Sequence, residues 1–506
     1  MSNILFDGLF SNADRQAVLA NFPDGGTLSY GEALDRSARM AHGLVARGVG
    51  RGDRVAVQVD KSIDAVLLYI ACLRVGAAFL PLNTAYTPAE VSYFLTNARP
   101  SLFVCTPKSA GDLQSVAATV PVMLETMGDQ GGEDGTLLDG IDNYPVTFEN
   151  VACTGDDLAA ILYTSGTTGR SKGAMLSHAN LLSNAETLRE LWQFSADDRL
   201  LHALPIFHTH GLFVATNITL MAGASMIFLP GFKTEAVLEH LPNATAMMGV
   251  PTFYTRLLAD ERFTRQAAEH MRLFISGSAP LLAETHLQFE ERTGKRILER
   301  YGMTETNMIT SNPYDGERRA GTVGFPLPGV EVRICDPDSG AAVPDGEIGV
   351  LEVRGPNVFS GYWEMPEKTA EDFRDDGFFI TGDLATVGDD GYIAIVGRSK
   401  DLIISGGYNI YPKEIELLLD DEPGVVESAV IGVPHPDFGE GIVALLVSKE
   451  PNFDADAVLA SLRDKVARFK HPKHVEVVDE LPRNTMGKVQ KNVLRDRYQS
   501  LFAPTS

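Results

Sequence analysis

Cysteine is scarce in this chain of 506 residues, and the four cysteines present are far apart. Cys72, Cys105, Cys153 and Cys335 show no Cys-x-x-Cys spacing. We therefore expect reduced, mostly buried thiols, as in cytoplasmic proteins, rather than a disulfide framework.

Long apolar runs are also missing, and no stretch approaches the length of about 20 residues that a membrane-spanning helix requires. The N-terminus, Met1-Ser-Asn-Ile-Leu-Phe-Asp7, lacks a basic region followed by a long apolar run, so no signal peptide is expected. These two features predict a soluble protein of the cytoplasm.

Basic residues are in short supply. The chain has 43 Lys and Arg against 67 Asp and Glu, which gives a formal net charge of −24. Such a balance argues against a nucleic acid or an anionic membrane as partner. An anionic ligand would consequently need a local cationic pocket.

Helix and strand signals alternate from the start of the chain. Ser29 and Glu32 form a capping-box pattern before a stretch of helical apolar spacing. A strand is expected at 54–59, followed by a helix at 63–73 that ends near Gly76. This rhythm predicts an α/β fold built on largely parallel sheets, and the length implies more than one domain.

The pattern of helix and strand signals changes near residue 400. A glycine-punctuated, β-rich stretch at about 330–396 precedes this point, and a segment with an α+β pattern follows it. The sequence therefore predicts a large domain over 1–399 and a small α+β domain over 400–506. Within the small domain we expect helices at 413–419 and 454–469 and strands at 425–433 and 442–448.

The run Thr164-Ser-Gly-Thr-Thr-Gly-Arg-Ser-Lys-Gly173 joins two apolar, strand-like segments. Gly166 and Gly169 allow backbone N–H groups to approach a polyphosphate, the hydroxyls add donors, and Lys172 adds charge. Gly169 stands three positions before Lys172 rather than directly before it, which excludes a Walker A loop. The alternative interpretation is an ordinary turn, because Gly/Ser/Thr-rich loops often only reverse the chain.

This loop is one of several motifs that occur in a characteristic order, and together they cover nearly the whole chain. They are Thr164–Gly173, Pro205-Ile-Phe-His-Thr-His-Gly211, Tyr301-Gly-Met-Thr-Glu305, Thr381-Gly-Asp383, Gly397-Arg-Ser-Lys-Asp401 with Gly406-Gly407, and Pro482-Arg-Asn-Thr-Met-Gly-Lys488. In this combination the chain resembles the acyl-adenylate-forming superfamily of acyl-CoA synthetases, luciferases and peptide-synthetase adenylation domains.

The resemblance implies both an activity and an architecture. A carboxylic acid would react with ATP to give an acyl-AMP and pyrophosphate, and the thiol of coenzyme A would then displace AMP, with Mg²⁺ as cofactor. The fold would have a large N-terminal domain of stacked mixed α/β sheets with a β-rich subdomain, followed by a small mobile α+β domain. The hinge would lie near Lys400.

The resemblance also implies roles for individual residues. Glu305 would bind Mg²⁺ beside a phosphate-facing Thr304, Tyr301 would stack on adenine, and Asp383 and Arg398 would contact the ribose. The full set of implied nucleotide contacts is Thr164, Ser165, Gly166, Thr167, Thr168, Gly169, Lys172, Ser278, Ala279, Pro280, Arg300, Tyr301, Gly302, Met303, Thr304, Asp383, Arg398 and Lys488. The implied catalytic set is Lys488, Glu305, Thr304 and His208.

Lys488 would bridge the incoming carboxylate and the α-phosphate as negative charge builds between them. Acylation of this lysine by an acyltransferase would delete the charge and switch off adenylation. For coenzyme A, the resemblance implies contacts to pantetheine from Gly406 and Gly407. Arg170 and Lys470 are candidate contacts for its phosphates, although a solvated patch explains them equally well.

Two arginines bear on the choice of acid. The acyl pocket would be lined by His208, Thr209, Tyr301 and the loop of Ser276, Gly277 and Ser278. Arg300 and Arg256 fall nearby, and a buried guanidinium gains most from a carboxylate partner. This predicts a diacid, and the combination is similar to that of malonyl-CoA synthetases, with methylmalonate as a poorer substrate. Alternatively, the arginines pair with protein acids such as Glu299 or Asp260.

Other functions stay open at this stage. The acid could be another small or aryl carboxylic acid. An adenylation domain of a peptide assembly line usually has an aspartate where this chain has His208, and we expect no carrier domain after residue 506. A luciferase-type oxygenase would need a large apolar pocket, against which Arg300 argues. A degenerate nucleotide-binding regulator would be expected to lose Lys488 or Glu305.

Overall fold

A computed structural model describes residues 2–128, 135–164, 171–337, 339–405, 408–450, 453–484 and 487–503. The chain divides into two compact units. The N-terminal unit comprises Met1–Glu331 and Val353–Phe379, and the C-terminal unit comprises Val332–Glu352 and Ile380–Ser506. Each unit is described by itself.

A nine-stranded sheet forms one half of the N-terminal unit. Its central strands β13, β12, β11, β9, β10 and β1 pair in parallel, and antiparallel strands complete both edges. In spatial order the strands are β15 (Phe325–Pro326), β14 (Asn307–Ser311), β13 (Ile297–Met303), β12 (Leu273–Ser276), β11 (Ala246–Gly249), β9 (Arg199–His202), β10 (Ser225–Phe228), β1 (Val18–Asn21) and β2 (Thr27–Ser29).

A six-stranded sheet forms the other half. Its order is β6 (Met123–Thr126), β5 (Leu102–Cys105), β3 (Arg54–Gln58), β4 (Ala78–Pro81), β7 (Leu158–Thr164) and β8 (Lys172–Ser177). The last two strands are antiparallel, and their register places Thr164 opposite Lys172. The two ends of the predicted phosphate loop are therefore fixed to each other by a β-ladder.

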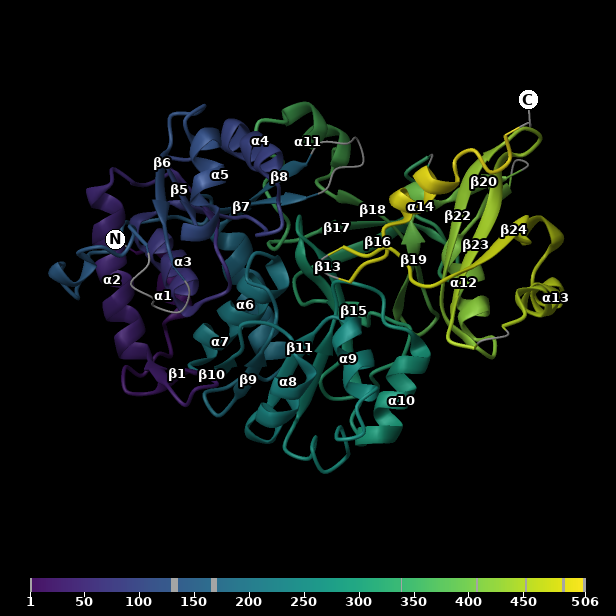
Figure 1. Cartoon of the computed structure of the whole chain (residues 1–506), viewed down its shortest axis with the longest axis horizontal. Coiled ribbons are helices and arrows are strands. Elements are labelled where there is room, and N and C mark those ends of the chain that lie inside the picture. Colours follow the sequence, from purple (N-terminus) through teal and green to yellow (C-terminus); the bar gives the residue numbers. More distant parts are fainter. Residues whose placement is uncertain are drawn as a thin grey trace. The chain divides into compact units, whose positions relative to one another are not determined.

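Helices cover both faces of these sheets. Figure 1 shows α3, α6 and α7 between the two sheets, α4 and α5 outside the six-stranded sheet, and α8, α9 and α10 outside the nine-stranded one. Every residue of α3 is buried, as expected for a helix enclosed on all sides. The bounds are α1 (Ile4–Leu9), α2 (Tyr30–Ala46), α3 (Ile63–Val75), α4 (Pro88–Ala98), α5 (Pro107–Ala117), α6 (His178–Leu191), α7 (Asn217–Ala222), α8 (Thr234–His240), α9 (Pro251–Leu258), α10 (Ala283–Thr293) and α11 (Pro366–Asp372).

The C-terminal unit contains most of a four-stranded sheet and a five-stranded one. The first has β16 (Glu331–Cys335), β17 (Gly349–Arg354), β18 (Phe379–Val387) and β19 (Ile393–Arg398). The second has β21 (Tyr408–Ile410), β20 (Ile403–Ser405), β23 (Gly439–Ser448), β22 (Val425–His435) and β24 (His474–Val478). Its helices are α12 (Pro412–Asp420), α13 (Ala455–Lys465) and α14 (Lys491–Tyr498).

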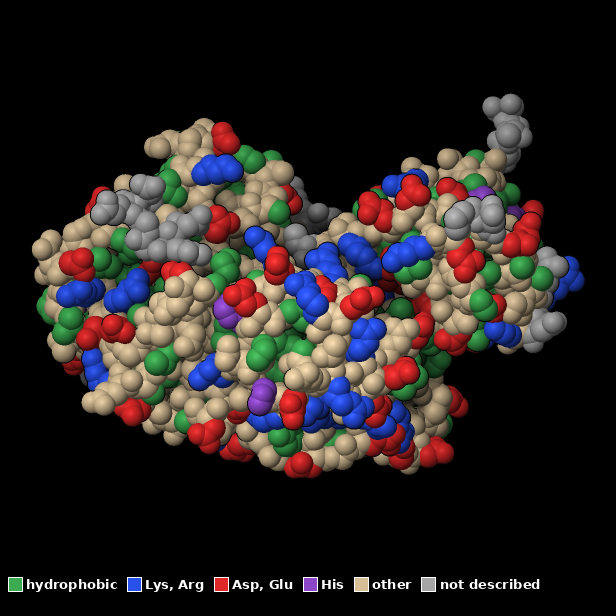
Figure 2. Space-filling model, turned by 60° about the horizontal axis from the view of Figure 1, so that its bottom comes forward, with side chains coloured by type: hydrophobic (Ala, Val, Ile, Leu, Met, Phe, Trp, Pro, Cys, Tyr) green, Lys and Arg blue, Asp and Glu red, His purple; other side chains and the backbone are tan. Residues whose placement is uncertain are grey.

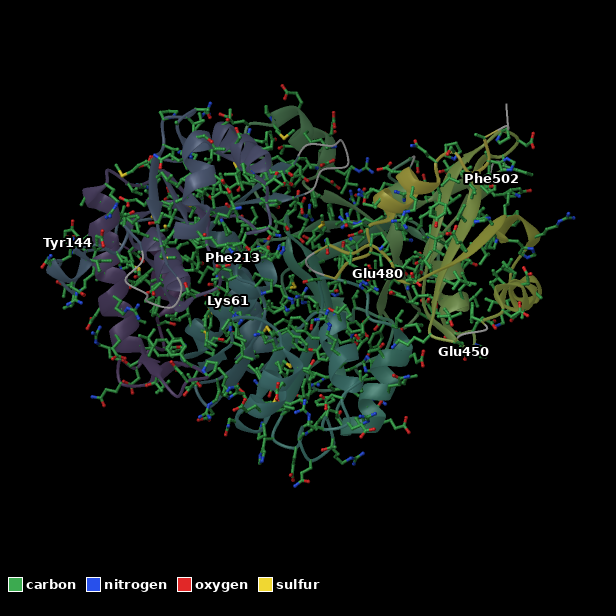
Figure 3. The ribbon with its side chains drawn as sticks, viewed as in Figure 1. Lys61, Tyr144, Phe213, Glu450, Glu480 and Phe502 are labelled. Carbon is green, nitrogen blue, oxygen red and sulfur yellow. The ribbon has the colours of Figure 1, made fainter. Side chains whose placement is uncertain are left out.

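Strands β22 and β23 are buried on both faces because their side chains alternate between two cores. On one face Val430 and Ile442 pack with residues of α12 and α13. On the other face Ile431 and Val443 pack with residues of α14. Phe502, labelled in Figure 3, packs on this second core.

The predicted α/β architecture is confirmed, with a large N-terminal part of several sheets and a small C-terminal α+β part. Ser29 and Glu32 form the expected capping box, and the helix at 63–75 ends in a left-handed cap at Gly76. The four cysteines are buried and free. No helix among the described residues is both long and apolar enough to cross a membrane. Figure 2 shows acidic and basic side chains interleaved on the face it presents.

The division into units differs from the predicted boundary between 399 and 400, because most of the four-stranded sheet groups with the C-terminal segment. A 3-10 turn at Ser399–Asp401 follows β19 at that point. A hinge near Lys400 stays a prediction.

Candidate active site

The carboxyl ends of parallel strands meet at one edge of the nine-stranded sheet. The register pairs Gly249 with Ser276 and Ser276 with Glu299, so the residues that follow β11, β12 and β13 are neighbours. In open α/β sheets, ligands bind outside this edge. The sheet thus brings Ser276, Gly277 and Arg300 together, and their role in an acyl pocket stays a prediction.

Arg300 is buried, with 4% of its surface exposed. Its Nε and Nη2 atoms are buried and have no hydrogen-bond partner within the described part of the chain. Burial lowers the pKa of the guanidinium to about 9. A buried charge without a counter-ion is costly, and this cost is offset when an anion binds.

Gly277 explains how the guanidinium fits in this position. A Cβ atom on residue 277 would lie 2.3 Å from Arg300 Cζ and 2.5 Å from Nη1. The guanidinium therefore lies directly against the backbone of residue 277, in space that any other residue would occupy. The next residue, Ser278, has a left-handed backbone with φ of 71° and directs its Oγ to His210 Nδ1 at 3.1 Å.

Further buried polar groups without partners lie in the predicted pocket segments. Within the described residues, no hydrogen bond is made by His208 Nε2, Thr209 Oγ1, His210 Nε2 or Ser276 Oγ. Burial lowers the pKa of His208 to about 4. Burial, followed by the charge of Arg300, lowers the pKa of His210 well below its usual value. Both imidazoles are therefore neutral at pH 7, and each has one donor and one acceptor nitrogen.

A π-helix at His210–Thr216 begins within the predicted His208 motif. His202, at the end of β9, contacts residues near both ends of this helix. Its Nε2 lies 3.0 Å from Gly211 O and 3.2 Å from Thr216 Oγ1. Lys61 Nζ in turn donates to His202 O at 2.8 Å. Figure 3 labels Lys61 and Phe213 in this part of the N-terminal unit. π-Helical turns occur frequently at functional sites.

Arg256 differs from Arg300. It lies on α9, whose buried residues are Phe253, Tyr254 and Leu257, and its side chain is exposed. The structure does not bring it into the buried group around Arg300, and its role in binding the acid stays a prediction. The protein acids proposed as alternative partners are engaged elsewhere. Glu299 lies 3.1 Å from His286 Nδ1, and Asp260 pairs with Arg262.

Glu305 lies in the turn between β13 and β14 and is buried, with 5% exposure. Its Oε1 accepts hydrogen bonds from Tyr362 Oη at 3.2 Å and from Thr164 Oγ1 at 3.4 Å. Thr304, Tyr301, Gly302 and Met303, which precede it, are partly buried. Glu305, the predicted Mg²⁺ ligand, is therefore in contact with Thr164, the first residue of the predicted phosphate loop.

Lys172 is buried, with 8% exposure, at the start of β8. Its Nζ lies 3.5 Å from Asp372 Oδ2 and 4.0 Å from the centre of the Tyr362 ring. Ser165, Gly166, Thr167, Thr168, Gly169 and Arg170 lie outside the described residues. Ala279 is partly buried and Pro280 is exposed, both after β12.

In the C-terminal unit, Asp383 on β18 stands directly opposite Arg398 on β19. Arg398 Nε donates to Asp383 Oδ1 at 2.6 Å, and Asp383 is buried. The Thr381 hydroxyl accepts from the Asp383 N–H at 3.0 Å and donates to Leu351 O at 2.7 Å. The turn motif and the arginine predicted to contact ribose thus form one hydrogen-bonded group.

The charges of Arg398 and Asp383 both act on the ammonium of Lys488. Its residue is exposed as a whole, but its ammonium is crowded by protein atoms and by the charge of Arg398, which together lower its pKa to about 8. Burial likewise lowers the pKa of Lys400. Among the predicted coenzyme A contacts, Lys470 pairs with Glu414 at 2.5 Å, and Gly406 and Gly407 lie outside the described residues.

Three residues at these sites were not singled out by the sequence. Tyr362 and Asp372 contact Glu305 and Lys172 from a segment with no recognisable motif. His210 lies within the predicted His208 motif, but only its burial beside Arg300 and Ser278 reveals its position. Among the described residues, no group of three or more His, Cys, Asp or Glu side chains could hold a metal. A Mg²⁺ ion bound by one or two carboxylates and by phosphate oxygens does not need such a group.

Two protein-family models match the chain. The model described as AMP-binding enzyme matches residues 10–363. The model described as AMP-binding enzyme C-terminal domain matches residues 414–488.

Among characterised proteins, the chain is 38% identical to a feruloyl-CoA synthase from Amycolatopsis sp over 480 residues, covering 94% of this chain and 95% of the relative. It is 33% identical to a malonate–CoA ligase from Arabidopsis thaliana over 555 residues, covering 97% and 88%. The crystal structure of ATP-bound MatB from Rhodopseudomonas palustris is 55% identical, with a TM-score of 0.97, covering 99% of this chain and 100% of that one.

Proposed function

This chain belongs to the family of AMP-binding enzymes, and on that premise we propose that it is an acid–thiol ligase for malonate. It joins malonate to coenzyme A at the expense of ATP, through a malonyl-AMP intermediate, with release of AMP and pyrophosphate. The similarity to the malonate–CoA ligase of Arabidopsis thaliana and to ATP-bound MatB supports the acid and the nucleotide.

The single observation that carries the choice of acid is the buried Arg300. Its Nε and Nη2 atoms have no partner in the described part of the chain, and the neutral His210 and the Ser276 hydroxyl beside it add further unused hydrogen-bonding groups. A second carboxylate would take two charge-assisted hydrogen bonds from the guanidinium. A monocarboxylic acid would leave the charge buried and unpaired.

In the first step, a carboxylate oxygen of malonate attacks the α-phosphorus of ATP, a new P–O bond forms, and the bond to pyrophosphate breaks. Lys488 stabilises the charge that develops between the carboxylate and the α-phosphate. Glu305 and the phosphates of ATP would hold Mg²⁺, which neutralises phosphate charge. In the second step, the thiolate of coenzyme A attacks the acyl carbon and AMP leaves.

Several finer assignments belong to the same proposal. Asp383 and Arg398 hold the ribose, and Tyr301 stacks on adenine. Rotation of the small C-terminal domain about the hinge at Lys400 switches the enzyme from adenylation to thioester formation. Gly406, Gly407 and Lys470 contact coenzyme A. Acylation of Lys488 by an acyltransferase would abolish adenylation, and the four buried free thiols support a cytoplasmic setting.

A panel of acids tests the function. Pyrophosphate release would be measured with malonate, methylmalonate, succinate, acetate and ferulate, each with and without coenzyme A. We expect malonate to have the highest kcat/KM, and thioester to form only with coenzyme A present. A preference for ferulate, the acid named in the 38% identical relative, would overturn the choice of malonate and leave the ligase function intact.

The lowered pKa of Lys488 predicts an alkaline limit for adenylation. The ammonium is the active form, and a pKa of about 8 means that its neutral fraction grows above that pH. In pyrophosphate–ATP exchange without coenzyme A, kcat/KM should fall about tenfold for each further pH unit. Lys488→Arg stays charged throughout, so its profile should be flat there although its rate is lower. The same decline in both proteins would contradict the assignment.

Gly277→Ala should disturb recognition of the distal carboxylate. Because the new Cβ would lie 2.3 Å from Arg300 Cζ, the guanidinium must move. We expect KM for malonate to rise roughly tenfold to a hundredfold, about 1.4–2.7 kcal/mol. Gly249→Ala is the matched control, since the atoms nearest to its Cβ would belong to Phe253 and Tyr254, at 3.1 Å or more, and not to Arg300. Equal effects of the two substitutions on malonate KM would argue against the role of Gly277.

A further inference from the structure

One short segment of the N-terminal unit connects the strand that leaves the phosphate loop to the metal carboxylate. The Phe359 N–H donates to Glu305 O at 2.8 Å, and the Trp363 N–H donates to Gly173 O at 2.8 Å. Between these two anchors, Tyr362 forms a β-bridge with Ala174. The backbone at 359–363 is thus fixed to both parts of the predicted ATP site.

The side chain of Tyr362 makes the same connection. Only 3% of the residue is exposed. Its hydroxyl donates to Glu305 Oε1 at 3.2 Å, and its ring carries the Lys172 ammonium 4.0 Å from its centre. Burial, followed by the charges of Glu305 and Asp372, raises the pKa of the phenol, so the hydroxyl is protonated and acts as the donor.

These contacts have a direct chemical meaning. A carboxylate that binds a metal is oriented by hydrogen bonds from residues around it, and loss of such a partner typically weakens metal binding 10- to 100-fold. A lysine held over an aromatic ring stays charged and in one place, because the face of the ring attracts the ammonium. Asp372 Oδ2 also lies 3.5 Å from the Lys172 Nζ.

We propose that Tyr362 is a positioning residue for ATP: its hydroxyl orients Glu305 toward the metal, and its ring holds Lys172 beside the phosphate loop. Through this one side chain, binding of the metal and binding of the phosphates are coupled. The inference rests on the adenylation step of the proposed function and is independent of which acid is activated.

The test separates the hydroxyl from the ring. Tyr362→Phe deletes the hydroxyl, which interacts with Glu305 and Asp372, and keeps the ring. Tyr362→Leu also deletes the ring under Lys172. Isothermal titration calorimetry would give the Kd of ATP for each protein, once with excess Mg²⁺ and once with EDTA. The Mg²⁺ dependence of pyrophosphate–ATP exchange would be measured alongside.

For Tyr362→Phe we expect the Mg²⁺ concentration at half-maximal exchange to rise about 10- to 100-fold. The Kd of ATP in EDTA should be unchanged. For Tyr362→Leu the Kd in EDTA should rise as well. Tyr69→Phe is the matched control, because it deletes another buried phenol hydroxyl, which lies 3.3 Å from Asn217. It should change neither quantity.

Two outcomes would overturn the proposal. One is an unchanged Mg²⁺ dependence in Tyr362→Phe. The other is an equal loss of ATP affinity with Mg²⁺ and with EDTA in that variant, which would indicate a structural role only. Failure of the proposed function would look different, because the unmodified protein would then bind Mg·ATP without releasing pyrophosphate with any acid of the panel.

Discussion

Replacement of Arg300 by alanine should lower kcat/KM for malonate by roughly 30- to 5,000-fold, corresponding to about 2–5 kcal/mol for the loss of one partner in a buried charge pair. The reason is that the guanidinium is buried beside Gly277 and His210 and has two unused donors in the described part of the chain. Without it, the distal carboxylate would lose the guanidinium that we propose as its counter-ion. Initial rates of pyrophosphate release over a range of malonate concentrations measure the effect.

The same variant should change specificity. Acetate lacks the second carboxylate, so its kcat/KM should hold or rise in Arg300→Ala, and the preference for malonate should shrink accordingly. Arg256→Ala is the variant for comparison, because the exposed side chain of Arg256 lies on α9, outside the buried group around Arg300. An unchanged preference for malonate over acetate in Arg300→Ala would remove Arg300 from the acyl pocket.

Replacement of Lys488 by alanine should slow adenylation but not thioester formation. Adenylation would lose the ammonium that we propose bridges the carboxylate and the α-phosphate, and we expect exchange of pyrophosphate into ATP to fall by at least about 10²- to 10³-fold. Formation of the thioester from supplied malonyl-AMP and coenzyme A should stay close to that of the unmodified protein, because that step needs no charge at the α-phosphate.

A second lysine variant tests whether the loss of any positive charge in this unit would have the same effect. Lys465 lies in the same unit and pairs with Glu422, so Lys465→Ala should leave both half-reactions intact. If Lys488→Ala slowed thioester formation as much as adenylation, the assigned role would be wrong.

The sequence predicted the elements whose pattern is local. The capping box at Ser29 and Glu32 is present, and the apolar run of 63–75 forms the helix that it indicates. The strand-like runs on either side of the predicted phosphate loop form β7 and β8, which pair antiparallel. Val45, the last apolar position of the helical spacing after the capping box, has half of its surface exposed, whereas the adjacent Leu44 is buried.

Features that depend on tertiary contacts could not be predicted. Tyr362 contacts Glu305 although the two are 57 positions apart in the sequence, and nothing in the local pattern around Tyr362 indicates that contact.

The exposure of Arg256 has a local cause that the helical spacing could have revealed. Phe253, Tyr254 and Leu257 define the buried face of α9, and at about 100° per residue Arg256 falls away from that face.

The π-helix at His210–Thr216 makes the pocket sensitive to chain length. A π turn accommodates one more residue than an α turn, and here its start is tied to His202 through Gly211 O, at 3.0 Å. Loss of one residue from the π-helix would restore the α-helical repeat. The segment that precedes the helix would then be rotated by about 100°. His208 and Thr209 would then face a different direction with no change in their identity, so deletions here should be tolerated less well than most substitutions.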